Sequence, residues 1–214
     1  ILVFGGIALV VSAGIVMVNE ATRQIPIVYA RRVRGNKMYG GQSTFLPLRV
    51  NQAGVIPIIF AVSLVLIPSL LGQYLGQIPN PMISRVAQTL TTLFKPTGVV
   101  YNAVYFVLVI GFTYFYTAIV FNPAKISEEI QKYGGFIPGI RPGTPTANYL
   151  NYILTRITLA GAVFLGLVAV LPSLVQGVSN VATLTTGGTG ALIVVSVVLD
   201  LIKKIDAQIS MREY

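Results

Sequence analysis

Long apolar runs alternate with shorter charged segments along the whole chain. A membrane-spanning helix needs about 20 apolar residues, because each residue advances about 1.5 Å across a hydrocarbon core of about 30 Å. The pattern predicts five such helices, at about residues 1–18, 53–75, 102–121, 156–175 and 183–204. Asp200 is the only carboxylate within these runs. We therefore expect an all-α membrane protein with five transmembrane helices.

The composition supports the same class. Hydrophobic residues make up 54% of the chain and charged residues only 10%, which differs clearly from soluble domains. The first run lacks the basic start and the small-residue cleavage site of a secretory signal peptide, so we interpret it as a span. The chain begins without methionine, and we expect it to be a fragment of a longer protein.

Basic residues concentrate on one side of the predicted membrane. Five spans place segments 19–52 and 122–155 and the tail 205–214 on the same side. These segments and the adjoining span ends hold thirteen of the fifteen Lys and Arg residues, whereas only Arg85 and Lys95 lie on the other side. Because Lys and Arg favour cytoplasmic loops, the bias predicts a cytoplasmic C-terminus and an N-terminus outside. Orientation signalling explains many of these charges, and their excess suggests an anionic partner.

The chain contains no cysteine and no histidine. Disulfides and thiolate ligands are therefore excluded, and the six carboxylates show no spacing that would converge on a metal ion. We expect no cofactor and no metal, and a hydrolase or metalloenzyme is poorly supported.

The sequence of the first cytoplasmic loop, residues 19–52, predicts a β-hairpin. A β-branched and aromatic run leads to Arg34, and Lys37 begins the return after Gly35 and Asn36. Such a Gly and Asn pair suits a two-residue turn. The tip of this hairpin would be densely cationic.

The second cytoplasmic loop, residues 122–155, predicts a short helix followed by a rigid turn. Asn122 and Pro123 form a helix start signal, and Gly134 and Gly135 would end the helix. The stretch that follows is FIPGIRPGTP, residues 136–145.

This stretch displays Arg141 between prolines and glycines. Prolines fix φ and glycines permit tight turning, so Arg141 has little freedom to retract. A guanidinium group suits carboxylates and phosphates, which favours contact with a partner. The alternative is that Arg141 caps a helix C-terminus or pairs with Glu128 or Glu129.

The second and fifth spans contain features unusual for a simple anchor. Pro57 and Pro68 predict a bend in the second span, because each lacks a backbone donor. The polar stretch at 185–190 would be tolerable at membrane depth only against protein or water. Asp200 is interpreted as paired near the interface, with a proton relay as the alternative.

Weaker signals concern helix packing. Gly111, Gly161 and Gly166 are expected to let helices approach closely. Leu165 is expected to face lipid. Residues 83–94 have an amphipathic pattern that suits the outer membrane surface.

Four runs of the sequence closely resemble the SecY protein-translocation channel family. They occur in the family's order from end to end, namely YGGQSTFLPLRVNQAGVIPIIFA (39–61), FYTAIVFNP (115–123), GGFIPGIRPGTPTANYL (134–150) and GGTGALIVVSVVLD (187–200). The resemblance covers the sixth to tenth spans of the ten in that family. It implies the C-terminal half of a helical channel with a cytoplasmic β-hairpin loop.

The resemblance implies two functional features within the membrane. Ile59 and Ile193 correspond to a mid-membrane constriction of aliphatic side chains, which can exclude ions and still yield to a passing chain. From the residues alone, both would be interpreted as ordinary bundle core. The second span would form one side of a lateral gate, and its implied gate residues are Pro57, Ser63 and Ile67.

The two cytoplasmic loops would dock the SecA motor or the ribosome, on the same resemblance. The residues implied in docking are Arg23, Arg31, Arg32, Arg34, Lys37 and Arg141. Contact with ribosomal RNA phosphates would make binding depend strongly on salt. Further implied partners are SecE, SecG, ribosomal proteins, signal peptides, nascent chains, membrane lipids and the N-terminal half of SecY.

The expected function is that of a central subunit of the Sec protein-conducting channel in the bacterial inner membrane. It would pass unfolded polypeptides across the membrane and release membrane-protein helices into lipid. It would not be an enzyme, because SecA or the translating ribosome would supply the energy. An inverted-repeat secondary transporter is the alternative, which broken helices favour and the lack of paired carboxylates disfavours. A membrane scaffold is a third class.

Overall fold

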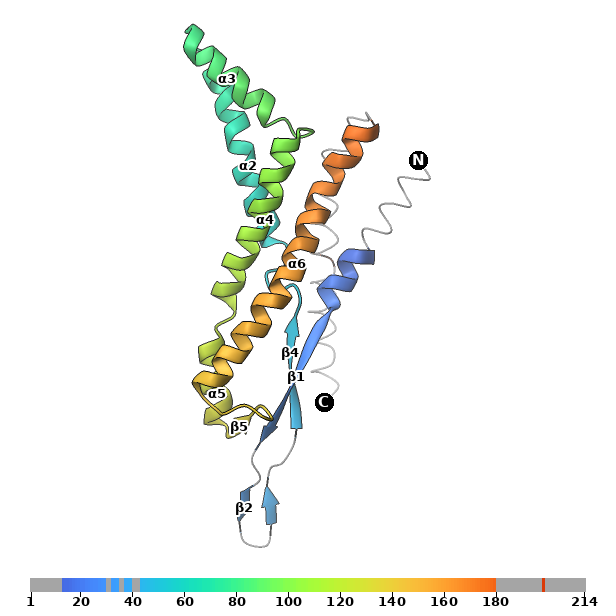
Figure 1. Cartoon of the computed structure of the whole chain (residues 1–214), viewed down its shortest axis with the longest axis vertical. Coiled ribbons are helices and arrows are strands. Elements are labelled where there is room, and N and C mark those ends of the chain that lie inside the picture. Colours follow the sequence, from blue (N-terminus) through green and yellow to red (C-terminus); the bar gives the residue numbers. More distant parts are fainter. Residues whose placement is uncertain (1–12, 30–31, 35–36, 40–42, 180–197, 199–214) are drawn as a thin grey trace.

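The described helices run along one long axis, with a β-hairpin at one end and α3 at the other (Figure 1). This computed structural model describes residues 13–29, 32–34, 37–39, 43–179 and 198. The β-hairpin and the segment that joins α5 to α6 lie toward the same end, as predicted for two loops that share one side of the membrane, and the connection between α2 and α3 lies at the other end (Figure 1).

The helices and strands follow in a simple order. The described helices are a segment at 13–20, α2 (Ile56–Leu75), α3 (Pro81–Leu93), α4 (Val99–Val120), α5 (Pro123–Lys132) and α6 (Thr144–Ser179). The strands are β1 (Thr22–Tyr29), β2 (Arg32–Arg34), β3 (Lys37–Tyr39), β4 (Ser43–Arg49) and β5 (Gly135–Phe136). Among the described residues, three segments are long and apolar enough to cross a membrane, namely Ile56–Leu75, Val99–Lys132 and Thr144–Leu174.

The chain is therefore a multi-pass membrane protein of mainly helical structure. The span predicted at 183–204 lies outside the described residues except for Val198, and only residues 13–18 of the span at 1–18 are described. α6 starts well before the span predicted at 156–175, because its first turns are buried against the β-sheet.

β1 is the central strand of a three-stranded antiparallel sheet with the order β4-β1-β5. Ile25 and Ile27 are each 3% exposed and alternate with exposed neighbours, so the strand has one buried face. Ile25 and Leu48 belong to a buried cluster with Leu150 and Ile153 of α6. This cluster fixes the sheet to the end of the helical bundle.

The predicted β-hairpin is confirmed. Its strand pairing is not limited to the tip and begins at Thr22 and Arg49. β1 pairs with β4 over most of the loop, and the short strands β2 and β3 extend the hairpin away from the helices (Figure 1). At the tip Arg34 pairs with Lys37, so only Gly35 and Asn36 separate the two strands. The pairing thus agrees with the predicted turn position, although the two turn residues lie outside the described part.

α2, α4 and α6 share one apolar core. Ile58 and Val65 of α2, Tyr105 of α4 and Leu165 of α6 belong to a single buried cluster. Leu165 is only 4% exposed, so the expectation that it faces lipid is wrong. Hydropathy did not distinguish a buried leucine from a lipid-facing one, because the inward and outward faces of a membrane helix are both apolar.

Glycines let the chain approach α6 closely at two points. A Cβ atom at Gly161 would lie 2.6 Å from the carbonyl oxygen of Val50, and one at Gly166 would lie 2.7 Å from the ring of Phe106. Gly166 thus lets α4 and α6 approach as predicted, whereas Gly161 admits the backbone before α2 and not another helix. A Cβ atom at Gly111 would meet nothing within 4 Å, so no described residue makes use of that glycine.

α3 folds back beside the C-terminal end of α2 (Figure 1). Its buried residue is Ala87, and a Cβ atom at Gly72 of α2 would lie 2.9 Å from the Ala87 carbonyl oxygen. Asn80 caps the helix, since its side chain accepts a hydrogen bond from the Met82 backbone N–H. The α2–α3 pair therefore packs through small residues.

Candidate functional site

α2 has a long exposed apolar face in the described structure. Its exposed large side chains are Ile56, Ile59, Phe60, Leu64, Leu66, Ile67, Leu70, Leu71 and Tyr74. The opposite stripe, which includes Ile58 and Val65, packs on α4 and α6. Large exposed apolar surfaces mark sites that bind protein, ligand or lipid. The face is therefore open to lipid, to other helices or to a passing chain.

The residues predicted for the pore and the gate differ in their surroundings. Ile59 and Ile67 are 43% and 45% exposed, and Ser63 lies between them at intervals of four residues on the same face. Pro57 is buried and belongs to the packed side of the helix. The other predicted constriction residue, Ile193, lies outside the described residues.

The middle of α2 has a weakened hydrogen-bond ladder. Pro68 lies inside the helix and offers no N–H to the Leu64 carbonyl oxygen. Ser63 Oγ donates to the Ile59 carbonyl oxygen and Ser69 Oγ donates to the Leu66 carbonyl oxygen, each at 2.8 Å. Serine side chains bonded in this way favour helix bending. This part of α2 is therefore suited to bending.

An amide pair holds the start of α2. Asn51 Nδ2 donates to Asn19 Oδ1 at 2.7 Å and to the Gly54 carbonyl oxygen at 3.2 Å. Gly54 has φ of 64°, which permits the turn into the helix. The Val50 N–H also donates to the Ala21 carbonyl oxygen at 2.9 Å. These bonds join the end of the first helix, the base of the hairpin and the beginning of α2.

The hairpin places basic residues at and near its tip. Arg34 and Lys37 are directly opposed, and like charges in opposed positions destabilise a strand pair. Arg32 lies opposite Tyr39 in the same ladder. Nearer the helices, Arg23 of β1 is exposed. Of the predicted docking residues of the hairpin, Arg31 alone lies outside the described part.

The segment that carries Arg141 is held by several contacts. Gly139 and Gly143 have φ values of 82° and 95°, so both turns depend on glycine. Ser127 Oγ of α5 donates to the Gly143 carbonyl oxygen at 2.7 Å, and Thr146 Oγ1 donates to the Arg141 carbonyl oxygen at 2.9 Å. The backbone of Arg141 is thus fixed while its side chain is exposed.

The alternatives for Arg141 receive no support from the described contacts. Arg141 forms no ion pair with a described carboxylate, and Glu128 and Glu129 are both exposed. α5 begins at Pro123 and ends at Lys132 as predicted, with Gly134 at φ of 71° just after it. The end of this helix is therefore completed by glycine.

β5 joins the second loop to the hairpin. Val28 and Tyr29 of β1 pair with Phe136 and Gly135 of β5. A Cβ atom at Gly135 would lie 3.0 Å from the Tyr29 ring and 3.1 Å from Ile27. We call β1 to β5 together with the Arg141 segment, residues 136–145, the hairpin platform. The sequence indicated Gly135 only as a helix end, because its strand partner is far away along the chain.

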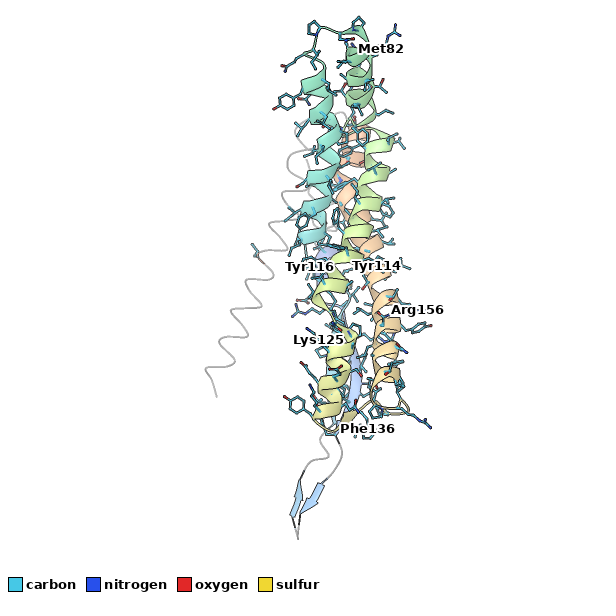
Figure 2. All side chains as sticks on the ribbon, turned by 90° about the vertical axis from the view of Figure 1, so that its left-hand side faces the viewer. Met82, Tyr114, Tyr116, Lys125, Phe136 and Arg156 are labelled. Atoms are coloured by element: carbon cyan, nitrogen blue, oxygen red, sulfur yellow. The ribbon has the colours of Figure 1, made fainter. Side chains whose placement is uncertain are left out.

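A second feature that the sequence did not reveal lies on α6. The Arg156 guanidinium carbon lies 4.5 Å above the centre of the Tyr152 ring. The Tyr114 hydroxyl of α4 donates to the Thr155 carbonyl oxygen at 3.0 Å. In Figure 2 Arg156 extends away from the bundle. The only sign of this contact in the sequence is the spacing of four residues between Tyr152 and Arg156, which makes them neighbours on the surface of a helix.

Among the described residues, no His, Cys, Asp or Glu side chains gather where they could hold a metal ion. α4 contains buried polar atoms that lack a described partner, namely Asn102 Oδ1, the Tyr105 hydroxyl and Thr117 Oγ1. They belong to neutral side chains and do not form a ligand set.

The fold and the platform together define a class of protein. It is a multi-pass helical membrane protein whose loops at one end form a single cationic platform. Comparison with protein families finds that the SecY family matches residues 1–202. The chain belongs to the SecY family, and the resemblance inferred from its sequence runs is confirmed.

Known relatives carry the same description, protein translocase subunit SecY. The relative from Mycobacterium tuberculosis (strain H37Rv) is 49% identical over 214 residues, covering 97% of this chain and 48% of that protein. The relative from Thermotoga maritima is 48% identical over 208 residues, covering 97% and 46%. The relative from Thermus thermophilus is 45% identical over 202 residues, covering 94% and 45%.

The chain thus spans about half the length of the curated relatives that it matches. These relatives are described as translocase subunits rather than as catalytic enzymes. The alternative of a secondary transporter receives no support from them.

Proposed function

We propose that this chain is the C-terminal half of the central subunit of the Sec protein-conducting channel. Such a subunit passes unfolded polypeptides across the membrane and releases membrane-protein helices sideways into lipid. The observation that carries the proposal is the SecY family match over residues 1–202. The exposed apolar face of α2 and the cationic hairpin platform give that match a physical basis.

Ile59 and Ile193 would form part of the channel constriction. Ile59 is 43% exposed on the face of α2 opposite the stripe that packs on α4 and α6, so its side chain is available to a pore. A ring of branched aliphatic groups excludes ions by dewetting. It also makes no hydrogen bonds to a passing chain, and so it does not retain the chain.

α2 would be one side of the lateral gate. Ser63 and Ile67 lie on its exposed face, where a signal-peptide helix can pack, and Pro57 would act from the packed side by setting the start of the helix. Pro68 and the two serine-to-carbonyl bonds make the middle of α2 easier to bend. An apolar signal helix would gain free energy by moving from an aqueous pore into lipid.

The hairpin platform would dock SecA or the ribosome, which supply the energy for transport. Arg34 and Lys37 oppose each other at the tip, and an anionic partner would relieve their repulsion. Arg141 stands on a fixed backbone, so little conformational entropy is lost when a partner binds. The remaining docking residues are Arg23, Arg31 and Arg32.

The same proposal includes the other partners and the orientation. The exposed face of α2 would meet the N-terminal half of SecY, with SecE and SecG elsewhere on the assembly. The excess of Lys and Arg supports a cytoplasmic position for the hairpin platform and an outside position for the start of this chain. The membrane would be the bacterial inner membrane.

Crosslinking from residue 59 tests the proposal. A photoreactive amino acid replaces Ile59 in the full-length channel, and a translocating polypeptide is stalled midway. The matched control carries the same probe at Leu167 of α6, which is 58% exposed on another helix. A strong adduct at residue 59 and none at residue 167 would support a pore position. Equal or absent adducts would remove Ile59 from the constriction.

A further inference from the structure

Arg156 stands where α6 changes from polar to apolar. Residues 157–175 contain no charged side chain, which is a length suited to crossing a hydrocarbon core. On the other side of Arg156, Leu150 and Ile153 pack against the sheet of the hairpin platform. Arg156 therefore stands at the end of an uncharged stretch long enough to cross the hydrocarbon core, where a basic side chain can reach lipid headgroups.

An exposed apolar stripe begins next to Arg156. Leu159, Leu167 and Leu174 are 51%, 58% and 58% exposed. At about 100° per residue, these leucines lie on the same face of α6 as Tyr152 and Arg156. A molecule with a charged head at Arg156 would therefore find apolar surface in line with it.

The guanidinium group is oriented for an external partner. It is stacked 4.5 Å above the Tyr152 ring, and stacking leaves the N–H groups at the edge of the guanidinium plane free to donate. The bond from Tyr114 to the Thr155 carbonyl oxygen ties this turn of α6 to α4. Arg156 forms no ion pair with any carboxylate in the described part of the chain.

We infer that Arg156 and Tyr152 form a binding site for the phosphate of an anionic phospholipid, with its acyl chains along the leucine stripe. The phosphate would accept hydrogen bonds from Arg156, and the lipid chains would cover Leu159 and Leu167. A lipid is favoured over free phosphate because the apolar stripe continues directly from the charged group. The net negative charge of such a lipid favours it over a zwitterionic one.

The test measures which lipid lies beside residue 159. A photoreactive amino acid replaces Leu159 in the full-length channel, which is reconstituted in vesicles of equal phosphatidylglycerol and phosphatidylcholine with identical acyl chains. Mass spectrometry then compares the two lipid adducts. We expect phosphatidylglycerol to be enriched about five-fold, which corresponds to about 1 kcal/mol for one basic residue.

The variants separate this site from general attraction of anionic lipid. Arg156→Gln should bring the adduct ratio close to one, and Arg156→Lys should keep part of the enrichment because it keeps the charge without the planar stack. Arg85→Gln on α3 removes an equal charge at the other end of the molecule and should leave the ratio unchanged. A probe at Val107, which is 65% exposed on α4, should show no enrichment.

Several results would overturn the inference. One is a ratio of phosphatidylglycerol to phosphatidylcholine adducts near one with native Arg156, and another is an enrichment of phosphatidylglycerol that survives Arg156→Gln. Loss of this enrichment on adding inorganic phosphate, or adducts to protein instead of lipid, would overturn it as well. The ratio with native Arg156 decides the question even if Arg156→Gln does not assemble. Transport plays no part in the readout, so the proposed function can stand if this inference fails.

Discussion

The hairpin platform and the membrane bundle expose opposite kinds of surface. The platform buries Ile25 and Leu48 against α6 and presents basic residues to its surroundings. The bundle buries one stripe of α2 and leaves Ile59, Phe60 and Ile67 exposed. Exposing an apolar face of this kind to water would raise the free energy of the folded state, whereas within a membrane the lipid can cover the face.

This difference shows how the two regions depend on the rest of the protein. The described part of the platform is held together by contacts within this chain, because β5 pairs with β1 and hydrogen bonds from Ser127 and Thr146 hold the Arg141 segment. Among the described residues, α2 packs on one side only, so a pore would need further helices opposite its exposed face. Variants of the platform should therefore act on binding, and variants of the bundle on packing or sealing.

The largest expected effect concerns packing within the bundle. Gly161→Ala would place a Cβ atom 2.6 Å from the backbone oxygen of Val50, which cannot move aside as a side chain can. We expect a loss of about 3 kcal/mol in the free energy of unfolding, measured as a lower midpoint in thermal unfolding of the full-length protein.

Gly111→Ala is the matched control, because a Cβ atom there meets nothing within 4 Å. It should change the free energy of unfolding by at most about 1 kcal/mol, and in the stabilising direction. Equal destabilisation by both variants would mean that the close approach at Gly161 is not used in the assembled protein.

The next effect concerns docking on the platform. Arg141→Glu should lower SecA-driven transport about tenfold, because it reverses a charge at a fixed position facing the partner. Its thermal unfolding should change little, since an exposed charge contributes little to stability. Transport assays with Arg85→Glu, on α3, provide the control for a charge reversal outside the platform. Normal transport by Arg141→Glu would remove Arg141 from the docking site.

A smaller effect is expected at the proposed constriction. Ile59→Asn should raise the ion conductance of the resting channel while transport continues, because a polar group in the ring favours wetting. Ile59→Val keeps a branched aliphatic side chain and should leave the conductance unchanged. Planar-bilayer recordings of both variants make the comparison. A tight seal in Ile59→Asn would count against a pore position for this residue.

The smallest effect concerns one charge at the hairpin tip. Arg34→Gln should reduce the slope of ribosome affinity against salt concentration by about 0.7 to 0.9 on logarithmic scales, because one phosphate contact is lost. Its affinity at low salt should fall accordingly. Binding measured over a series of salt concentrations gives the slope. An unchanged slope would show that Arg34 makes no phosphate contact.

Much of this architecture followed from short-range patterns. The apolar runs predicted α2, α4 and the membrane part of α6, since a helix that crosses lipid must satisfy its own backbone and needs a fixed apolar length. Asn122, Pro123 and Gly134 predicted both ends of α5, because capping depends on residues next to the helix end. The hairpin tip followed from the Gly35 and Asn36 pair for the same reason.

The sequence by itself determined the membrane class, the family, the order of the helices and the position of the hairpin. Tertiary structure decided which side of each helix is buried, and so it placed Leu165 inside and Ile59 outside. It also decided that Gly135 joins the two loops and that Arg156 is stacked on Tyr152 beside α4. The physical reason is that these relations depend on partners distant along the chain, and in a membrane helix inward and outward faces are equally apolar.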